Sequence, residues 1–136
     1  MNPPYAAILD LNSGISGDML LGALMDLGAD IEQLNQQLQT LQIPGFHLTS
    51  ERMTKKGITC CRAIVEVEED HHHHRHLSQI EAIVRRGNLP EDVVERSLEA
   101  FRRIAEAESK IHGKPVEKIA FHEVGALDAI VDVCGC

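Results

Sequence analysis

The sequence predicts an α+β fold in which short strands, including one hairpin, pack against several helices. Apolar residues recur at helical spacing in several segments, whereas over residues 60–68 they alternate with a period of two. The two kinds of segment follow one another as strand, helices, hairpin and helices. A chain of 136 residues is long enough to bury one core, so we expect a single domain over residues 1–136.

The N-terminal segments predict one strand and two helices. Residues 5–11, YAAILDL, form a short apolar run that is typical of a buried strand. Residues 19–28 are apolar on nearly every side and end at Gly28, as expected of a core helix. Asp30 can cap a helix over residues 31–41, because its carboxylate can accept hydrogen bonds from the free amides of the first turn.

A hairpin is predicted over residues 46–70, with its turn near residues 55–57. Ser78 can cap a helix over residues 79–87, and Pro90 suits the first turn of a long helix that ends near Gly113. The expected inward faces of the second hairpin arm and of the long helix are Cys61, Ala63, Val65 and Val67, and Val94, Leu98, Phe101, Ile104, Ala105 and Ile111. Residues 116–125 are expected to form a short strand or extended lead to a final apolar helix.

Composition excludes several classes of function. The net charge of −8 argues against binding to nucleic acid or anionic membranes, which requires clustered Lys and Arg. No apolar run approaches the ~20 residues that span a bilayer, and the N-terminus shows no export signal. We therefore expect a cytoplasmic protein with four reduced cysteines. The C-terminal helix is apolar on several faces, which predicts that another element packs against it. We therefore expect the chain to be the N-terminal portion of a longer protein, and we expect that protein to form homo-oligomers.

Residues 68–76, EEDHHHHRH, are the first segment that predicts chemistry. Neutral imidazole is a good ligand for Ni, Zn and Cu, and the preceding carboxylates attract cations. Adjacent ligands on a loop suit capture and transfer of a metal better than permanent coordination. A polar loop without metal is the alternative. The candidate ligands are His71, His72, His73, His74 and His76.

Two further segments carry candidate functional residues. In residues 10–19, DLNSGISGDM, Gly14 and Gly17 permit close backbone approach, and Asp10 and Asp18 suit a phosphate bridged by a divalent ion. A structural turn with Asp18 as a helix cap is the alternative. In residues 121–132, FHEVGALDAIVD, His122 and Glu123 precede a predicted helix that has Asp128 and Asp132 on one face. These side chains could form a metal site or an acid–base site. The alternative is a helix start stabilised by Glu123, with exposed aspartates.

Taken together, these motifs resemble the LarC-type nickel-insertion proteins over residues 5–136. The motifs SGISGDM and HEVGA-DAIVD are distinctive, and AEAESKIHG and HLSQI occur between them in the same order. The resemblance implies a lyase-class nickel chelatase that inserts Ni²⁺ into pyridinium-3,5-bisthiocarboxylic acid mononucleotide, forming a metal–carbon bond. It also implies dependence on CTP with Mg²⁺ or Mn²⁺, through a C-terminal part, and maturation of lactate racemase-type enzymes, with the apo racemase as a partner.

The resemblance further implies roles for individual residues. The histidine run would recruit nickel, with His122 as a further ligand. His122, Glu123 and Asp128 would serve metal transfer or the substrate side, and Asp10, Ser13 and Asp18 would shape the loop near the substrate phosphate. Ala120 stands where family members commonly have another His, which removes one possible ligand. This portion alone would be inactive.

Two other functions are compatible with the sequence. A nickel or divalent-metal chaperone or storage module would need the histidine run but neither distant motif. A phosphohydrolase would use the aspartates around a divalent ion. The residues identify neither the base for the pyridinium C–H proton nor a preference for nickel over cobalt or zinc.

Overall fold

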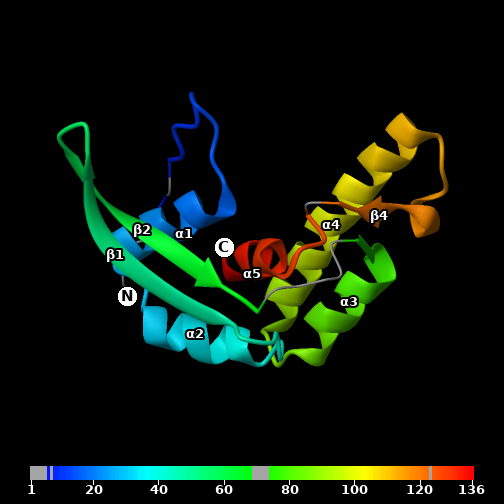
Figure 1. Cartoon of the computed structure of the whole chain (residues 1–136), viewed down its shortest axis with the longest axis horizontal. Coiled ribbons are helices and arrows are strands. Elements are labelled where there is room, and N and C mark those ends of the chain that lie inside the picture. Colours follow the sequence, from blue (N-terminus) through cyan, green and yellow to red (C-terminus); the bar gives the residue numbers. More distant parts are fainter. Residues whose placement is uncertain (1–5, 7, 69–73, 123) are drawn as a thin grey trace.

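The computed structural model describes residues 6, 8–68, 74–122 and 124–136, and within them it confirms the α+β prediction. Helix α5 lies at the centre, with the β1–β2 hairpin, α1 and α2 on one side and α3 and α4 on the other (Figure 1). The elements are α1 (Gly17–Asp26), α2 (Ile31–Gln39), β1 (His47–Lys55), β2 (Ile58–Glu66), β3 (Arg75–His76), α3 (Leu77–Arg86), α4 (Glu91–His112), the 3₁₀ turn η1 (Val116–Lys118), β4 (Ala120–Phe121) and α5 (Leu127–Gly135).

The predicted hairpin is confirmed. Strands β1 and β2 pair antiparallel from His47 opposite Glu66 to Lys55 opposite Ile58. The two residues that connect them, Lys56 and Gly57, have φ angles of 51° and 83°, as a tight type I′ turn requires. The chain therefore reverses without splaying the strands.

The face of β2 expected to point inward does so, because α1 packs against it. Ala63 is buried, and Cys61, Val65 and Val67 are half-buried. A Cβ atom on Gly22 of α1 would lie 2.5 Å from the Cys61 carbonyl oxygen. The helix can approach the strand this closely only because Gly22 has no side chain.

The predicted cap of α2 is also confirmed. The Asp30 carboxylate accepts from the backbone N–H groups of Glu32 and Gln33 at 3.0 and 3.1 Å. Further along α2, the Asn35 side chain donates to the Leu48 carbonyl at 2.8 Å and accepts from the Leu48 N–H at 3.3 Å. These two hydrogen bonds hold α2 against β1 and satisfy both the N–H and the carbonyl of Leu48.

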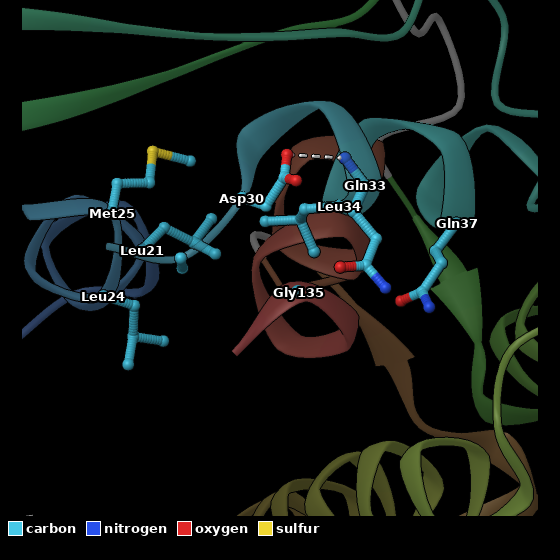
Figure 2. Close-up of a pocket in the computed structure, with 9 residues that line it drawn as sticks. Leu21, Leu24, Met25, Asp30, Gln33, Leu34, Gln37 and Gly135 are labelled. Atoms are coloured by element: carbon cyan, nitrogen blue, oxygen red, sulfur yellow. Dashed lines mark hydrogen bonds between the residues drawn. The ribbon is translucent and has the colours of Figure 1, made fainter. Parts of the chain in front are cut away.

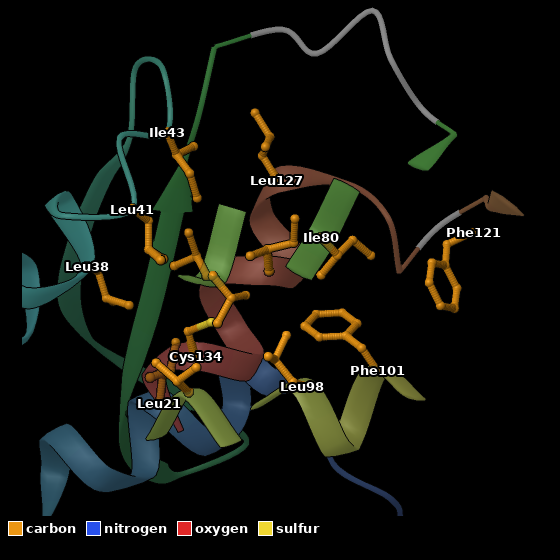
Figure 3. Packing of buried hydrophobic residues seen from close by; sticks show 14 of the residues in the cluster. Leu21, Leu38, Leu41, Ile43, Ile80, Leu98, Phe101, Phe121, Leu127 and Cys134 are labelled. Atoms are coloured by element: carbon orange, nitrogen blue, oxygen red, sulfur yellow. The ribbon is translucent and has the colours of Figure 1, made fainter. Parts of the chain in front are cut away.

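The core is mostly aliphatic, as the composition predicts, with two phenylalanines at one end (Figure 3). Phe101 of α4 and Phe121 of β4 are fully buried, with ring centroids 6.4 Å apart and planes at 61°. Edge-to-face contacts of this kind add to the free energy of burial. They attach the short β3–β4 ladder to the long helix.

Helix α3 begins earlier than expected, so the prediction of Ser78 as its cap is wrong. Leu77 is the first helical residue, and His76 occupies the N-cap position. The Gln79 side chain accepts from the His76 backbone N–H at 2.9 Å, which satisfies the amide that begins the helix. The ladder partner of His76, Ala120, sets this boundary by holding His76 extended.

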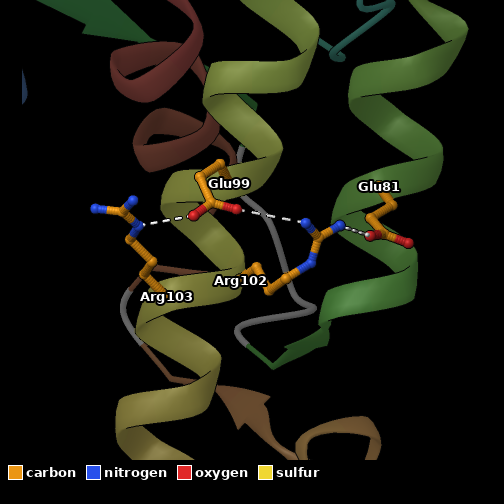
Figure 4. Close-up of polar contacts among 4 residues, drawn as sticks. All are labelled: Glu81, Glu99, Arg102 and Arg103. Atoms are coloured by element: carbon orange, nitrogen blue, oxygen red, sulfur yellow. Dashed lines mark hydrogen bonds and ion pairs between the residues drawn. The ribbon is translucent and has the colours of Figure 1, made fainter.

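Helix α4 has the predicted ends, with Pro90 as N-cap and Gly113 in the left-handed region at φ 62°. Ile111 was expected in its apolar stripe but is 79% exposed. The charged face is solvated, as predicted. Figure 4 shows Arg102 between Glu99 and Glu81 of α3, at 3.4 and 3.7 Å, and Arg103 paired with Glu99 at 2.8 Å.

The prediction of a buried strand over residues 5–11 is wrong for the residues that the structure describes. Residue 6 and residues 8–11 form no strand, and Ile8 is 93% exposed. A strand requires a partner for its backbone groups, and β1–β2 and β3–β4 pair only within themselves among the described residues. Helix α1 likewise buries one face alone, and Met19 and Leu27 are exposed.

The C-terminal helix is not the unpartnered surface that its composition suggested. Leu127, Ile130, Val131 and Cys134 are buried between the two halves of the molecule. The large exposed apolar side chains lie instead around residues 8–19 and at a few scattered positions. Among the described residues, no helix has both the length and the apolar character needed to cross a membrane. All four cysteines are free thiols.

Candidate functional site

The end of the histidine run meets the HEVGA motif through a short antiparallel ladder. Arg75 pairs with Phe121 and His76 with Ala120. In the same register, His74 is opposite His122. The two Nδ1 atoms lie 2.9 Å apart, and the rings meet edge to face with centroids at 4.5 Å. The ladder thus makes neighbours of two residues that are 48 positions apart in the sequence.

Two side-chain contacts to backbone carbonyls hold this ladder in place. The Arg75 guanidinium, which is buried, donates to the Gly125 carbonyl at 2.7 Å. The His76 Nδ1 atom lies 2.8 Å from the Ile119 carbonyl oxygen. Because a carbonyl can only accept, the neutral form of His76 has its proton on Nδ1 and a lone pair on Nε2. A carbonyl partner on the second nitrogen is the arrangement that orients metal-binding histidines.

The other candidates for the metal site are only partly described. His71, His72, His73 and Glu123 lie outside the described residues. His74, His76 and His122 are exposed. Within the described part of the chain, no group of three or more His, Cys, Asp or Glu side chains is arranged to hold a metal ion.

The SGISGDM motif and the last helix meet at a second place, where α1 begins. A Cβ atom on Gly17 would lie 2.5 Å from Cβ of Asp132 in α5. Gly17 therefore allows the start of α1 to approach α5, a packing role that was not predicted for it. Gly14 has φ 78° and donates to the Leu11 carbonyl at 2.9 Å, so it forms a turn that favours glycine.

Asp132 is the electrostatic centre of this junction. Burial, together with the nearby charges of Asp18 and Asp128, raises the pKa of its carboxyl to about 6, while a hydrogen bond from the Asp18 backbone acts in the opposite direction. Its Oδ1 atom is buried and has no hydrogen-bond partner among the residues that the structure describes. Asp132 therefore exchanges a proton at a pH where ordinary aspartates are already ionised.

Asp18 lies in the first turn of α1, two residues after the N-cap Ser16, so the interpretation of Asp18 itself as the cap is wrong. Its Oδ1 accepts from the Met19 N–H at 2.9 Å and from the Ser16 hydroxyl. Asp128 has the corresponding place in the first turn of α5. Both carboxylates are favoured by the partial positive charge at a helix start.

The remaining N-terminal candidates lie away from this junction. Asp10 and Ser13 are exposed, in the segment that precedes α1. A cleft of about 400 Å³ adjoins the junction itself. Asp132, Ser16 and Cys136 supply its polar groups, and Ile15, Leu20 and Val133 its apolar wall. Burial and the Asp132 charge raise the pKa of the Cys136 thiol to about 11, so this thiol is protonated at neutral pH.

A further cleft, of about 340 Å³, lies between α1 and α2. None of the residues that were predicted to bind metal or substrate lines it. Figure 2 shows Leu21, Leu24 and Met25 on the α1 side and Gln33 and Gln37 on the α2 side. The glutamines of α2 are the sequence feature that contributes most of the polar side chains to this cleft.

Comparison with known proteins identifies the family. The model of the nickel insertion protein family matches residues 7–136. The chain belongs to the nickel insertion protein family. Its relatives include a pyridinium-3,5-bisthiocarboxylic acid mononucleotide nickel insertion protein of Desulfitobacterium hafniense strain DSM 10664 / DCB-2, which is 52% identical over 96% of this chain and 32% of the relative.

Two other relatives give the same result. A protein of the same name from Geobacillus kaustophilus is 45% identical over 92% of this chain and 33% of its own length. A putative nickel insertion protein of Roseiflexus castenholzii is 45% identical over 97% and 33%. The chain thus spans about a third of the length of these curated relatives. No solved structure matches it significantly.

Proposed function

We propose that this nickel insertion protein supplies Ni²⁺ to pyridinium-3,5-bisthiocarboxylic acid mononucleotide and so forms the nickel-pincer nucleotide. The observation that carries the proposal is the meeting of distant motifs. The ladder brings His74, at the end of the histidine run, to His122, and the α1–α5 junction brings SGISGDM to the last helix. A metal buffer needs the histidines alone, so the second junction favours an enzyme over a chaperone or storage module.

The reaction replaces a C–H bond of the pyridinium ring with a nickel–carbon bond and releases a proton. His71, His72, His73, His74, His76 and His122 would hold the nickel before transfer. Asp10, Ser13, Asp18, Glu123 and Asp128, with Gly14 and Gly17, would lie toward the nucleotide. Of the described carboxyls, Asp132 has a pKa raised to about 6, which suits acceptance of the ring proton near neutral pH.

The remaining parts of the proposal come from the resemblance. The reaction is a lyase-type step that consumes CTP with Mg²⁺ or Mn²⁺, through a region beyond this chain. The product serves lactate racemase-type enzymes, and the apo racemase is a partner. We place the protein in the cytoplasm as a homo-oligomer, with residues 1–136 as one domain that is inactive alone.

The test incubates the full-length protein with nickel, the bisthiocarboxylated nucleotide and CTP, and follows the product by mass spectrometry. Product should form only when all three are present, with CTP consumed in step, and the 136-residue chain alone should form none. CTP hydrolysis without nickel or precursor would instead indicate a phosphohydrolase. Nickel binding with no product under any condition would indicate a chaperone.

A further inference from the structure

We propose that His74 and His122 form a two-histidine chelate for a divalent metal ion through their Nδ1 atoms. The identity of the metal as nickel rests on the proposed function. The ligand pair rests on the geometry of two strands. The chelate combines His74 of the histidine run with His122 of the HEVGA motif. It gives His74 a role that the other histidines of the run do not share.

The register of the ladder explains why the rings meet. Arg75 is opposite Phe121 and His76 is opposite Ala120, so one step outward places His74 opposite His122. Directly opposite residues of antiparallel strands have Cβ atoms about 4.5–5.5 Å apart, which brings their side chains into contact. Neither ring needs a change of backbone to reach the other. His74 and His122 each lie one residue beyond a strand of the ladder, and the ladder brings the two rings together.

The separation of the two nitrogens is short enough for both to bind one metal ion. Imidazole–metal bonds of about 2.0–2.1 Å place two cis nitrogens about 2.9 Å apart at a right angle and about 3.4 Å apart in a tetrahedron. The observed Nδ1···Nδ1 distance is 2.9 Å. The two nitrogens, which share a hydrogen bond at this distance, therefore lie close enough together to bind one metal ion.

Metal binding replaces the hydrogen bond that the two rings share. In the metal-free pair, one Nδ1–H donates to the other Nδ1. When the metal binds, the donor ring moves that proton from Nδ1 to Nε2, and both Nδ1 lone pairs become ligands. With both rings neutral, no net proton is released. Two protein ligands leave coordination positions open, which permits transfer of the ion to a sulfur-containing acceptor.

The test uses the 136-residue chain with His71, His72 and His73 replaced by Ser, so that nickel binding to the run does not obscure the pair. Nickel titration by calorimetry compares His74→Ala and His122→Ala in this background. Each should lower nickel affinity at least about tenfold, since loss of even an outer-shell partner typically costs 10–100-fold. The matched controls His47→Ala and His112→Ala, at exposed histidines elsewhere, should leave affinity unchanged.

X-ray absorption of the nickel-loaded chain supplies a readout that does not depend on affinity. The background protein should show two imidazole ligands, and each Ala variant one fewer. Unchanged affinity and unchanged imidazole scattering in both variants would overturn the proposal and leave a hydrogen bond only. Circular dichroism checks the fold of each variant, and if either is unfolded the ligand count of the background protein decides. Since nucleotide and CTP are absent, failure here is distinct from failure of nickel insertion.

Discussion

At the scale of single residues, Asp132 makes the stability of the folded chain depend on pH. Its pKa is about 6 in the folded chain, against an ordinary value of 3.8. Between these values the folded state keeps a proton that the unfolded chain has lost. Stability from this residue is therefore complete below pH 3.8 and decreases as the pH rises toward 6. Above pH 6 the folded chain carries a partly buried carboxylate beside Asp18 and Asp128.

Replacement of Asp132 by Asn should therefore stabilise the chain at neutral pH. Asn keeps an oxygen that can accept from the Asp18 backbone but carries no charge. We expect a gain of about 1–2 kcal/mol at pH 7.5, after discounting a two-unit shift for solvent screening of a half-buried group. The gain should disappear toward pH 4. Urea unfolding of both proteins from pH 4 to 7.5 measures it.

The control is Asp10→Asn, which removes a charge from an exposed position. Its unfolding free energy should stay within about 0.5 kcal/mol of the parent at every pH. A less stable Asp132→Asn variant at pH 7.5 would show that the ionised carboxylate has a partner and is not under strain. In that case Asp132 would also be unsuited to accept a proton in the proposed reaction.

At the scale of elements, Gly22 permits a close approach of α1 to β2. Gly22→Ala should destabilise the chain by about 1–3 kcal/mol, because the new Cβ would lie 2.5 Å from the Cys61 carbonyl oxygen, which is fixed in the hairpin. Without this contact, Gly→Ala in a helix would stabilise by about 0.5–1 kcal/mol. The sign of the change therefore tests the packing, and thermal unfolding measures it.

Gly135→Ala is the matched comparison in α5. There the new Cβ would lie 3.1 Å from a Leu21 methyl group, which belongs to a flexible side chain and can shift. Its effect should be smaller than that of Gly22→Ala. Equal effects, or stabilisation by Gly22→Ala, would contradict the placement of α1 on the hairpin.

Elements whose signals are local could be predicted from the sequence. The Asp30 cap, the Lys56–Gly57 turn and the Gly113 helix end each depend on a few neighbouring residues, and all are confirmed. Residues 8–11 were assigned to a strand because apolar runs indicate burial, but burial also requires a partner distant in sequence. The pairing of His74 with His122 could not be predicted for a related reason. It depends on the register between two strands that are distant in sequence, and neither strand alone specifies that register.

At the scale of the whole molecule, α5 joins the two halves of the fold. It packs against α1, α2 and β2 on one side and against α3 and α4 on the other. Ile130, in the middle of α5, is fully buried. The prediction of a single domain over residues 1–136 then has a physical meaning: the hairpin half and the α3–α4 half should unfold together, because they share this helix.

Ile130→Ala tests that cooperativity. It should lower the free energy of unfolding by about 2–5 kcal/mol, the usual cost of such a change in a core. Ile111→Ala is the same chemical change at a side chain that is 79% exposed, and should cost no more than about 0.5 kcal/mol.

Urea unfolding is followed by far-ultraviolet circular dichroism for the helices and by hydrogen exchange for the β1–β2 amides. With Ile130→Ala both midpoints should fall together, since α5 contacts both halves. If the hairpin amides kept their midpoint while the helices lost theirs, the hairpin half would be a separate cooperative unit.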